Sequence, residues 1–298
     1  MGGYVLGPVP TVDPVMVERR AAALGTRSVK AAAKAKALDL ILRCIDLTTL
    51  EGMDTPGHVR ALCGRARRPD FESDAPSVAA VCVYPALVGV ARAALDGSTV
   101  KVAAVAAAFP SGQSFLEVRL EEVRRSIEAG ADEIDVVLGR NAFLAGDHAR
   151  VHDEIAAAKD AAGSAHLKVI LEVGELGSYD QVRKASQIAL DAGADTIKTS
   201  TGKVSPAAAP PACLVMLEAI RDRYLATGRA AGFKAAGGIR TAKQAWHYLV
   251  LVKETLGDGW LTPARFRIGA SALLDDVLRQ RRRLRTGLYE DRRVFGGE

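Results

Sequence analysis

Eight short apolar runs punctuate this chain of 298 residues, and their spacing restricts the folds open to it. The runs cover residues 40–46, 77–83, 100–106, 133–137, 167–173, 196–199, 232–236 and 266–269. Each interval between them is long enough to hold a crossover helix. Near-continuous apolar strands that alternate with helices are typical of a parallel sheet buried on both faces. Eight such units predict an α/β protein with the TIM (β/α)8 barrel architecture.

The barrel is expected to occupy residues 38–285, with an N-terminal helical extension at 1–37 and a C-terminal tail at 286–298. The extension contains two segments rich in Ala, Lys and Arg, at 13–23 and 29–37, which have high helix propensity. We expect it to cover one end of the barrel or another subunit. Side-chain N-caps are expected for three barrel helices, at Thr55, Ser114 and Ser178.

Composition excludes several classes of protein. With 49% hydrophobic residues the chain can bury one large core, but it contains no run of about 18 apolar residues that could span a membrane. Residues 1–10 lack the basic start and apolar centre of a secretion signal. The four cysteines form no Cys-x-x-Cys pair, which favours reduced thiols and a cytoplasmic location.

The tetrapeptide Ala-Gly-Ala-Asp occurs twice, at 129–132 and 192–195, and each copy joins a predicted helix to a predicted strand. Asp135 and Lys198 stand at the same distance past these two copies, in the fourth and sixth strands. Alternate strands of a barrel contribute side chains to the same layer. We therefore expect both side chains to point inward and to face each other, on the assumption that the two strands keep the same register.

A lysine in a buried strand has two explanations. The ammonium of Lys198 could reach the barrel rim and stay solvated, or it could be desolvated and act as a nucleophilic amine. Lys234, in a similar setting, and Asp135 favour the second, although a structural ion-pair network also perturbs pKa values. Burial and mutual repulsion are expected to lower the pKa of both lysines, so that one is neutral near pH 7 while the other stays charged. Asp46 and Thr48 stand at another strand end and join this predicted constellation.

Glycine-rich loops follow the last three predicted strands. Backbone N–H groups in such loops bind anions, and the loops after strands seven and eight often hold phosphate in these barrels. The residues concerned are Gly202, Lys203, Gly237, Gly238, Arg240, Gly269 and Ser271. They predict a phosphorylated substrate. His148 and His152 are spaced to share a helix face but lie away from the strand ends, so we expect no metal site.

Several of these motifs resemble those of the deoxyribose-phosphate aldolase family. The most specific are the Lys-Thr-Ser-Thr-Gly-Lys run at 198–203 and the Gly-Phe-Lys with its following Gly-Gly at 232–238. Further matching segments lie at 45–50, 81–85, 132–137 and 266–271. The resemblance implies a class I barrel lyase that needs neither metal nor cofactor. Such an enzyme reversibly cleaves 2-deoxy-D-ribose 5-phosphate to acetaldehyde and D-glyceraldehyde 3-phosphate.

The resemblance also implies roles for individual residues. Lys198 resembles the lysine that forms the Schiff base, Lys234 the second lysine that lowers its pKa, and Asp135 the acid/base that works through water. The positions expected to bind substrate are Asp46, Thr48, Cys82, Gly202, Lys203, Gly237, Gly238, Arg240, Gly269 and Ser271. Some members of the family end in a tyrosine that reaches the site, and Tyr289 is the candidate in this chain.

Two rival functions stay open at this point. A phosphosugar isomerase or lyase could use the same barrel with a lysine as general base and no covalent intermediate. A nucleic-acid-binding protein could use the arginine-rich segment 279–293, which holds much of the net charge of +5. The inward lysines favour the aldolase, so we expect a phosphorylated small molecule as partner, and neither nucleic acid nor membrane. A homodimer is the assembly that we consider.

Overall fold

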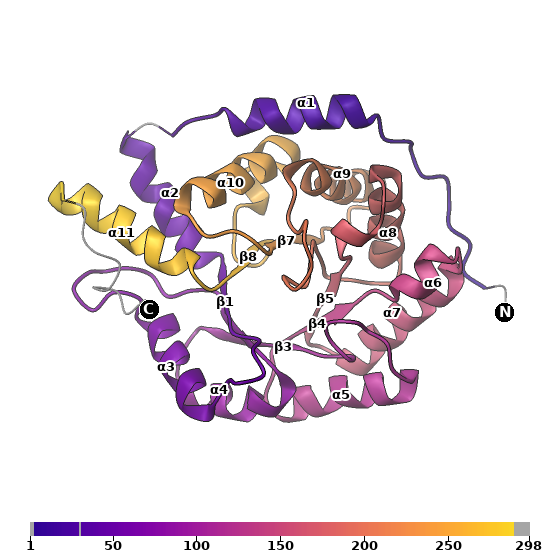
Figure 1. Ribbon diagram of the computed structural model, residues 1–298, viewed down its shortest axis with the longest axis horizontal. Coiled ribbons are helices and arrows are strands. Elements are labelled where there is room, and N and C mark those ends of the chain that lie inside the picture. Colours follow the sequence, from indigo (N-terminus) through magenta and orange to yellow (C-terminus); the bar gives the residue numbers. More distant parts are fainter. Residues whose placement is uncertain (1–2, 30, 289–298) are drawn as a thin grey trace.

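The computed structural model describes residues 3–29 and 31–288. Its centre is a closed barrel of eight parallel strands in the order β1 to β8, surrounded by a ring of helices (Figure 1). The strands are β1 (Ile45–Thr48), β2 (Ala80–Val83), β3 (Lys101–Val105), β4 (Glu133–Val137), β5 (His166–Ile170), β6 (Thr196–Lys198), β7 (Gly232–Ala236) and β8 (Phe266–Ala270). The predicted (β/α)8 barrel is therefore confirmed.

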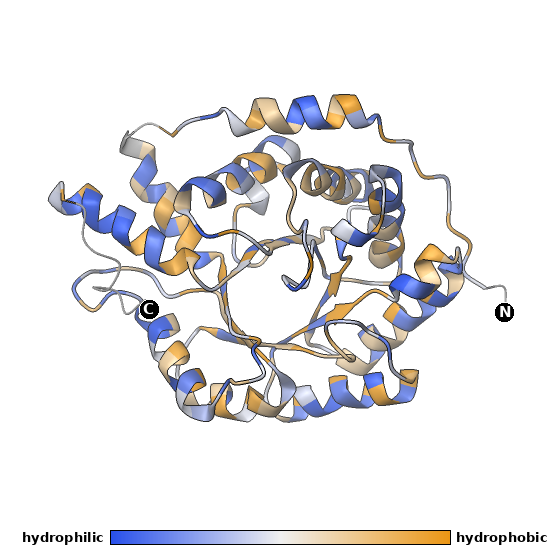
Figure 2. Ribbon diagram, viewed as in Figure 1, coloured by the Kyte–Doolittle hydropathy of each residue, from blue (hydrophilic) through white to orange (hydrophobic). Residues whose placement is uncertain are grey.

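The helices of the described residues show their hydrophobic sides to the barrel and their hydrophilic sides to solvent (Figure 2). The α-helices are α1 (Pro14–Gly25), α2 (Ala31–Arg43), α3 (Pro56–Arg67), α4 (Val88–Ala94), α5 (Leu116–Glu128), α6 (Arg140–Leu144), α7 (His148–Ala162), α8 (Tyr179–Asp191), α9 (Pro210–Thr227), α10 (Ala242–Leu256) and α11 (Leu273–Thr286). Short 3-10 helices are η1 (Pro85–Leu87), η2 (Val173–Glu175) and η3 (Asp258–Trp260). None of the helices in this part of the chain is both long and apolar enough to cross a membrane.

The first apolar run, residues 40–46, differs from the prediction. Its first half is the end of α2, and β1 begins only at Ile45. Ile41 and Leu42 are buried because they continue the inward face of that helix, not because they enter the sheet. A short apolar run cannot by itself distinguish a buried helix end from a buried strand.

Two of the three predicted N-caps are confirmed. The hydroxyls of Thr55 and Ser178 each accept a hydrogen bond from the backbone N–H three residues further on, at the starts of α3 and α8. The cap at Ser114 was wrong, because α5 begins one residue later than that cap requires. Phe115 occupies the N-cap position there and makes no side-chain capping bond.

The register of the barrel corrects one assumption. Asp135 on β4 is aligned with Lys168 on β5, which is in turn aligned with Thr196 on β6. Lys198 therefore lies two residues beyond the position that is level with Asp135 in the hydrogen-bond ladder. Because the strands of a closed barrel tilt relative to its axis, Lys198 still comes to lie opposite Asp135 across the interior. Lys198 is itself aligned with Lys234 on β7.

The barrel interior has an apolar side and a charged side. Apolar side chains from β2, β3 and the loop after β1 form a cluster of their own: Leu50, Ala80, Cys82, Ala103 and Val105. The buried charged side chains of the interior are Asp46, Glu133, Asp135, Lys168, Lys198, Lys234 and Arg267. The main hydrophobic core lies between the barrel and the helices. The interior of the barrel can therefore hold charged side chains.

The N-terminal extension lies along the outside of the ring (Figure 1). Helix α1 packs on α9 and α10, and Arg20 pairs with Glu218 there. Ahead of α1, the Tyr4 hydroxyl donates to Asp191 at 3.0 Å. Helix α1 therefore lies against the flanks of two ring helices and not over an end of the barrel. That the extension also covers another subunit stays a prediction.

Candidate active site

Three strands bring one carboxylate and two lysines together inside the barrel. Lys198 Nζ and Lys234 Nζ both donate to Asp135 Oδ2, at 2.8 and 2.9 Å. Asp135 and Lys234 are fully buried, and Lys198 is 3% exposed. The predicted inward, facing arrangement of Asp135 and Lys198 is confirmed, and the same carboxylate oxygen brings in Lys234.

A third lysine, on β5, completes the surroundings of this carboxylate. Lys168 Nζ donates to Asp135 Oδ1 at 2.9 Å and pairs with Glu133 Oε2 at 2.6 Å. Lys168 was not among the predicted site residues, because residues 167–173 form a largely apolar run. The available signal was the alternation of the strand, since the neighbours of Lys168 on either side are apolar and face the helices.

The contacts continue from Lys234 into a closed circuit of charges. Asp46 pairs with Lys234 through Oδ2 at 2.5 Å and accepts from Arg267 through Oδ1 at 2.6 Å. Arg267 also donates to both carboxylate oxygens of Glu133, at 2.7 and 3.1 Å. Since Glu133 binds Lys168, the circuit closes, and each of its six groups touches at least two others. Lys198 joins the circuit through Asp135 alone. Sequence reasoning missed Glu133 and Arg267 because both stand at the beginnings of their strands, away from the expected site.

The charges of this buried set do not balance when all groups are ionised. Its cations are Lys168, Lys198, Lys234 and Arg267, and its anions are Asp46, Glu133 and Asp135. An unpaired charge is costly to hold inside a protein. Loss of one proton from one of the lysines makes the set neutral.

The pKa of Lys198 is lowered, so this lysine is the member of the set that loses a proton most readily. Burial is the largest influence and lowers the pKa, the Asp135 carboxylate raises it, and repulsion by Lys234 lowers it again. Because burial and Lys234 outweigh the single carboxylate, Lys198 gives up its proton more readily than an ordinary lysine.

The expectation that the pKa of Lys234 lies below its ordinary value was wrong. Burial does act in that direction, but attraction by Asp135 and Asp46 outweighs it, and the pKa of Lys234 is raised above its ordinary value. The pKa of Asp135 lies well below its usual range, because Lys168 and Lys198 overcome the effect of its burial. Lys234 and Asp135 therefore remain charged while Lys198 is the group that can become neutral.

A cavity of about 380 Å³ opens above Lys198 at the C-terminal end of the barrel. Loops after β1, β6, β7 and β8 form its walls. It contains eight of the positions expected to bind substrate: Thr48, Gly202, Lys203, Gly237, Gly238, Arg240, Gly269 and Ser271. The glycine at Gly237 is required there, since its φ is +95° and a Cβ would lie 2.5 Å from that of Ala207.

The other two expected positions lie outside the cavity lining. Asp46 is buried in the charged circuit, where it contacts Lys234 and Arg267. Cys82 is buried in the apolar cluster of the interior. Burial also raises the pKa of the Cys82 thiol.

An ion pair crosses the mouth of the cavity. Lys203 Nζ, in the loop after β6, lies 2.8 Å from Glu51 Oε1 in the loop after β1, and both side chains are partly exposed. Glu51 was not among the predicted site residues, because it belongs to none of the motifs described above. A phosphate group that binds Lys203 would have to displace the Glu51 carboxylate from it.

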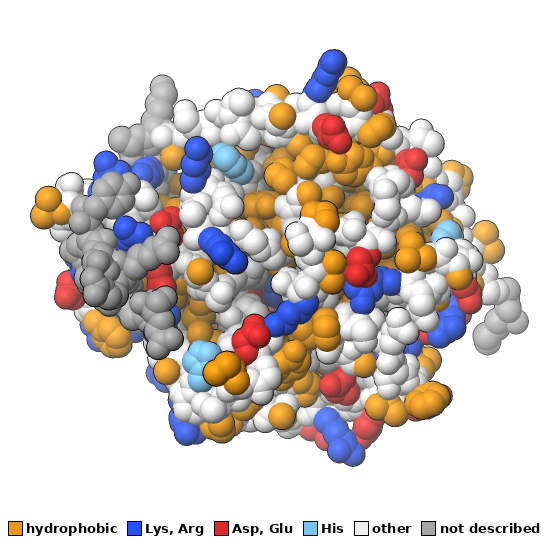
Figure 3. Space-filling model, in the orientation of Figure 1, with side chains coloured by type: hydrophobic (Ala, Val, Ile, Leu, Met, Phe, Trp, Pro, Cys, Tyr) orange, Lys and Arg blue, Asp and Glu red, His pale blue; other side chains and the backbone are white. Residues whose placement is uncertain are grey.

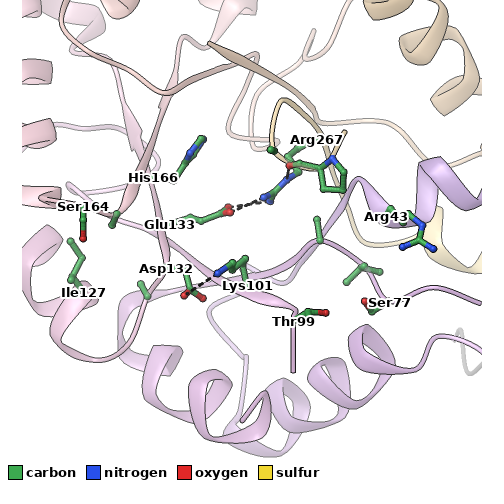
Figure 4. Close-up of a pocket in the computed structure, with 16 residues that line it drawn as sticks. Arg43, Ser77, Thr99, Lys101, Ile127, Asp132, Glu133, Ser164, His166 and Arg267 are labelled. Carbon is green, nitrogen blue, oxygen red and sulfur yellow. Dashed lines mark hydrogen bonds and ion pairs between the residues drawn. The ribbon is translucent and has the colours of Figure 1, made fainter. Parts of the chain in front are cut away.

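A second pocket, of about 730 Å³, lies at the opposite end of the barrel, where the strands begin (Figure 4). Glu133 and Arg267 contact each other at its floor, and Lys101 approaches Asp132 at its side. His166 also lines it, and burial lowers the pKa of that histidine. The charged circuit therefore runs through the barrel, with Lys198 at one end and Arg267 at the other.

The arginine-rich end of α11 is engaged in ion pairs. Arg281 pairs with Asp39 of α2, and Arg282, which is largely buried, pairs with Glu72 at 2.7 Å. On the face drawn in Figure 3, basic, acidic and hydrophobic side chains of the described residues are intermixed. These two arginines fix α11 to α2 and to the loop after α3. Tyr289 lies outside the described residues.

Fold and site define a (β/α)8-barrel protein with a desolvated lysine of the kind that covalent enzymes use as a nucleophile. Residues 40–277 match the DeoC/LacD aldolase family, and the chain belongs to this family. The predicted family and enzyme class are confirmed by this match.

Relatives of known name agree with this assignment. A deoxyribose-phosphate aldolase from Mus musculus is 49% identical over 290 residues, which cover 93% of this chain and 91% of the relative. The aldolase of the same name from Homo sapiens is 47% identical over 287 residues, covering 93% and 90%. Among solved structures, the tetrameric deoxyribose phosphate aldolase from Aeropyrum pernix has a TM-score of 0.62 at 27% identity, and the match covers 91% of this chain and 99% of that one.

Proposed function

We propose that this protein reversibly cleaves 2-deoxy-D-ribose 5-phosphate to acetaldehyde and D-glyceraldehyde 3-phosphate through a Schiff base on Lys198. The observation that carries the proposal is the buried set of four cations and three anions, in which Lys198 alone has a lowered lysine pKa. A neutral amine at the floor of a cavity is the nucleophile that such a reaction needs. The substrate is the one for which the relatives are named.

The carbon–carbon bond breaks after the amine is joined to the substrate. The lone pair of Lys198 attacks C1 of the open-chain sugar, and uptake of one proton from solvent with loss of water gives an iminium. Asp135, directly or through a water molecule, accepts the proton of the C3 hydroxyl. The electron pair of the C2–C3 bond then forms the double bond of an enamine while the iminium nitrogen regains its lone pair. C3 becomes the aldehyde carbon of D-glyceraldehyde 3-phosphate.

The second half of the reaction restores the amine. Asp135 returns the proton to C2 of the enamine, which becomes the iminium of acetaldehyde. Water adds to this iminium, the carbon–nitrogen bond breaks, acetaldehyde leaves neutral Lys198, and the proton taken up when the iminium formed returns to solvent. The same proton serves both halves, so the carboxylate ends each cycle ionised. Its low pKa is compatible with this because the lysines around it hold the ionised form.

The remaining charged residues keep the two reacting groups in their protonation states. Lys234 stays an ammonium and repels a proton on Lys198. Lys168 holds the other oxygen of Asp135, so that Oδ2 faces the two lysines. Asp46 pairs with Lys234 and is itself held by Arg267. Asp46 therefore acts in this proposal through Lys234 rather than by touching substrate.

The phosphate group is proposed to lie against the glycine-rich loops of the cavity. Lys203 supplies a positive charge, and the loops after β7 and β8 supply backbone N–H groups. The residues assigned to this role are Gly202, Lys203, Gly237, Gly238, Arg240, Gly269 and Ser271. Binding of the remote phosphate would position the reacting carbons over Lys198. Thr48 is assigned to the sugar end, whereas Cys82, which is buried in the apolar cluster of the interior, is not assigned a contact with substrate.

Two measurements together distinguish this proposal from an isomerase or lyase without a covalent intermediate. Release of acetaldehyde from 2-deoxyribose 5-phosphate is measured with a chelator present, and the enzyme is then treated with acetaldehyde and borohydride. We expect turnover and a stable ethyl group on Lys198. Lys198→Ala should lose both while keeping its circular dichroism spectrum. Turnover without labelling of Lys198 would support the non-covalent alternative.

Assembly, location and domain limits complete the proposal. We assign residues 1–37 as a helical extension, 38–285 as the catalytic barrel and 286–298 as a tail. A cytoplasmic location is supported by the four free, buried cysteines. A homodimer remains our proposal for the assembly, and light scattering of the full chain would test it against the tetramer known from the Aeropyrum pernix relative.

A further inference from the structure

A buried carboxylate at the end of β5 has no part in the mechanism above. Glu172 is fully buried and has left-handed backbone angles, with φ 55° and ψ 58°. These angles are strained for a residue with a side chain and persist only where surrounding contacts impose them. The contacts of Glu172 therefore indicate the role of this residue.

The carboxylate of Glu172 holds the loop that follows β6. Thr201 donates to it twice, through its backbone N–H at 3.2 Å and through its hydroxyl at 2.5 Å. The same Thr201 hydroxyl oxygen accepts from the backbone N–H of Lys203 at 3.0 Å. One buried anion thus determines the position of Thr201 and, through it, the start of the Lys203 side chain.

Arg140 holds Glu172 from the other side. Its Nη1 lies 3.4 Å from Glu172 Oε2, and its Nη2 donates to the carbonyl oxygens of Pro110 and Ser111, each at 3.1 Å. The guanidinium is largely buried. Arg140 and Glu172 therefore tie together the loops after β3, β4, β5 and β6 at the catalytic end of the barrel.

The reacting lysine and the phosphate loop are held by different contacts. Lys198 belongs to β6 and is fixed by the ladder with β5 and β7. Thr199 is still tied to β7, since its backbone N–H donates to the carbonyl oxygen of Lys234 and its hydroxyl bonds Ala236. Strand β6 has ended before Thr201. From there the loop is held by the hydrogen bonds that Thr201 donates to Glu172.

We propose that Glu172 is a positioning residue that sets the affinity for the phosphate group of the substrate through Thr201, without taking part in the chemical step. The inference rests on the proposed function, in which Lys203 and its loop bind phosphate. Loss of the carboxylate charge should loosen this loop but leave Lys198 and Asp135 in place. The effect should therefore appear in KM and not in the formation of the Schiff base.

The matched variants are Glu172→Gln and Glu175→Gln. Glu175 pairs with the same arginine at 2.8 Å, but its side chain is 42% exposed and it lies outside the bond between Glu172 and Thr201. Thr201→Val removes the donating hydroxyl from the other partner and keeps the volume of the side chain. This second variant decides the matter if Glu172→Gln does not fold.

We expect Glu172→Gln and Thr201→Val to raise KM for 2-deoxyribose 5-phosphate about tenfold, as the loss of one charge-assisted hydrogen bond would. The value of kcat should stay within about threefold, and trapping of acetaldehyde on Lys198 by borohydride should proceed at the wild-type rate. Glu175→Gln should behave as the wild type. Equal KM values for the two glutamine variants would overturn the proposal, and so would a trapping rate that falls as much as kcat/KM.

A measurement without turnover separates this inference from the proposed function. Inorganic phosphate should raise the Tm of the wild type and of Glu175→Gln, and should raise that of Glu172→Gln much less at the same concentration. If the wild type neither turns over the sugar nor is trapped by borohydride, the proposed function fails and the phosphate shift still tests the role of Glu172. An equal shift in all three proteins would refute that role.

Discussion

Replacement of Lys234 by methionine tests the electrostatic basis of the site. Lys198 Nζ and Lys234 Nζ contact the same oxygen of Asp135, at 2.8 and 2.9 Å, so the two nitrogens are close neighbours. Two unit charges roughly 5 Å apart repel each other by about 3 kcal/mol at an effective dielectric constant of about 20. Lys234→Met removes this repulsion, while the attraction of Asp135 for a proton on Lys198 remains.

The consequence is a smaller fraction of neutral amine. At a pH below the pKa of Lys198, about 3 kcal/mol corresponds to a roughly hundredfold loss of the neutral form and of kcat/KM. The sign follows from the chemistry: the neutral amine is the reactive form, so a raised pKa moves the rising limb of the rate profile to higher pH. Activity should therefore recover in part as the pH is increased.

The assay is kcat/KM for 2-deoxyribose 5-phosphate as a function of pH, with circular dichroism to check the fold. Lys168→Met is the matched control, because it also removes a buried ammonium in contact with Asp135 but one bound to the other oxygen. We expect its profile to move less than that of Lys234→Met. Superimposable profiles for Lys234→Met and the wild type, or an equal displacement in the control, would refute the argument.

Two further predictions concern the mouth of the cavity. Glu51→Gln should lower KM for 2-deoxyribose 5-phosphate by up to about fivefold, since an exposed ion pair contributes at most about 1 kcal/mol and the phosphate must displace it from Lys203. A KM that is unchanged or higher in steady-state assays would show that this pair does not compete with substrate. Gly237→Ala should raise KM severalfold with little change in kcat, because its positive φ and the contact with Ala207 force the loop to move. Equal losses in borohydride trapping would place the defect at Lys198 instead.

Much of the fold follows from patterns that are local in the chain. The apolar runs predicted eight strands, because a strand buried on both faces needs apolar side chains along its whole length. The repeated Ala-Gly-Ala-Asp predicted that Asp135 and Lys198 face each other, although the register between their strands differs from the one assumed. The prediction succeeded since both residues have the same parity within their strands, and parity decides which face of the sheet a side chain takes.

Other parts of the site depend on which segments meet in space. Nothing in the local sequence around Lys168, Glu133 and Arg267 distinguishes a solvated side chain from a buried one. Closure of the barrel decides this, because it brings Glu133, at the start of β4, together with Arg267, near the start of β8, across the interior. The same holds for Glu172, whose left-handed backbone is imposed by contacts with Thr201 and Arg140.

The amino-acid sequence by itself determined the family, the barrel and the three residues at its centre, because these depend on short motifs and on the alternation of strand and helix. Only the tertiary structure decided which lysine has the lowered pKa. Burial alone would lower the pKa of both Lys198 and Lys234, and the outcome is set by the carboxylates that each one meets. Lys234 contacts two of them and Lys198 one, a difference that arises from side chains far apart in the chain and therefore has no local signature.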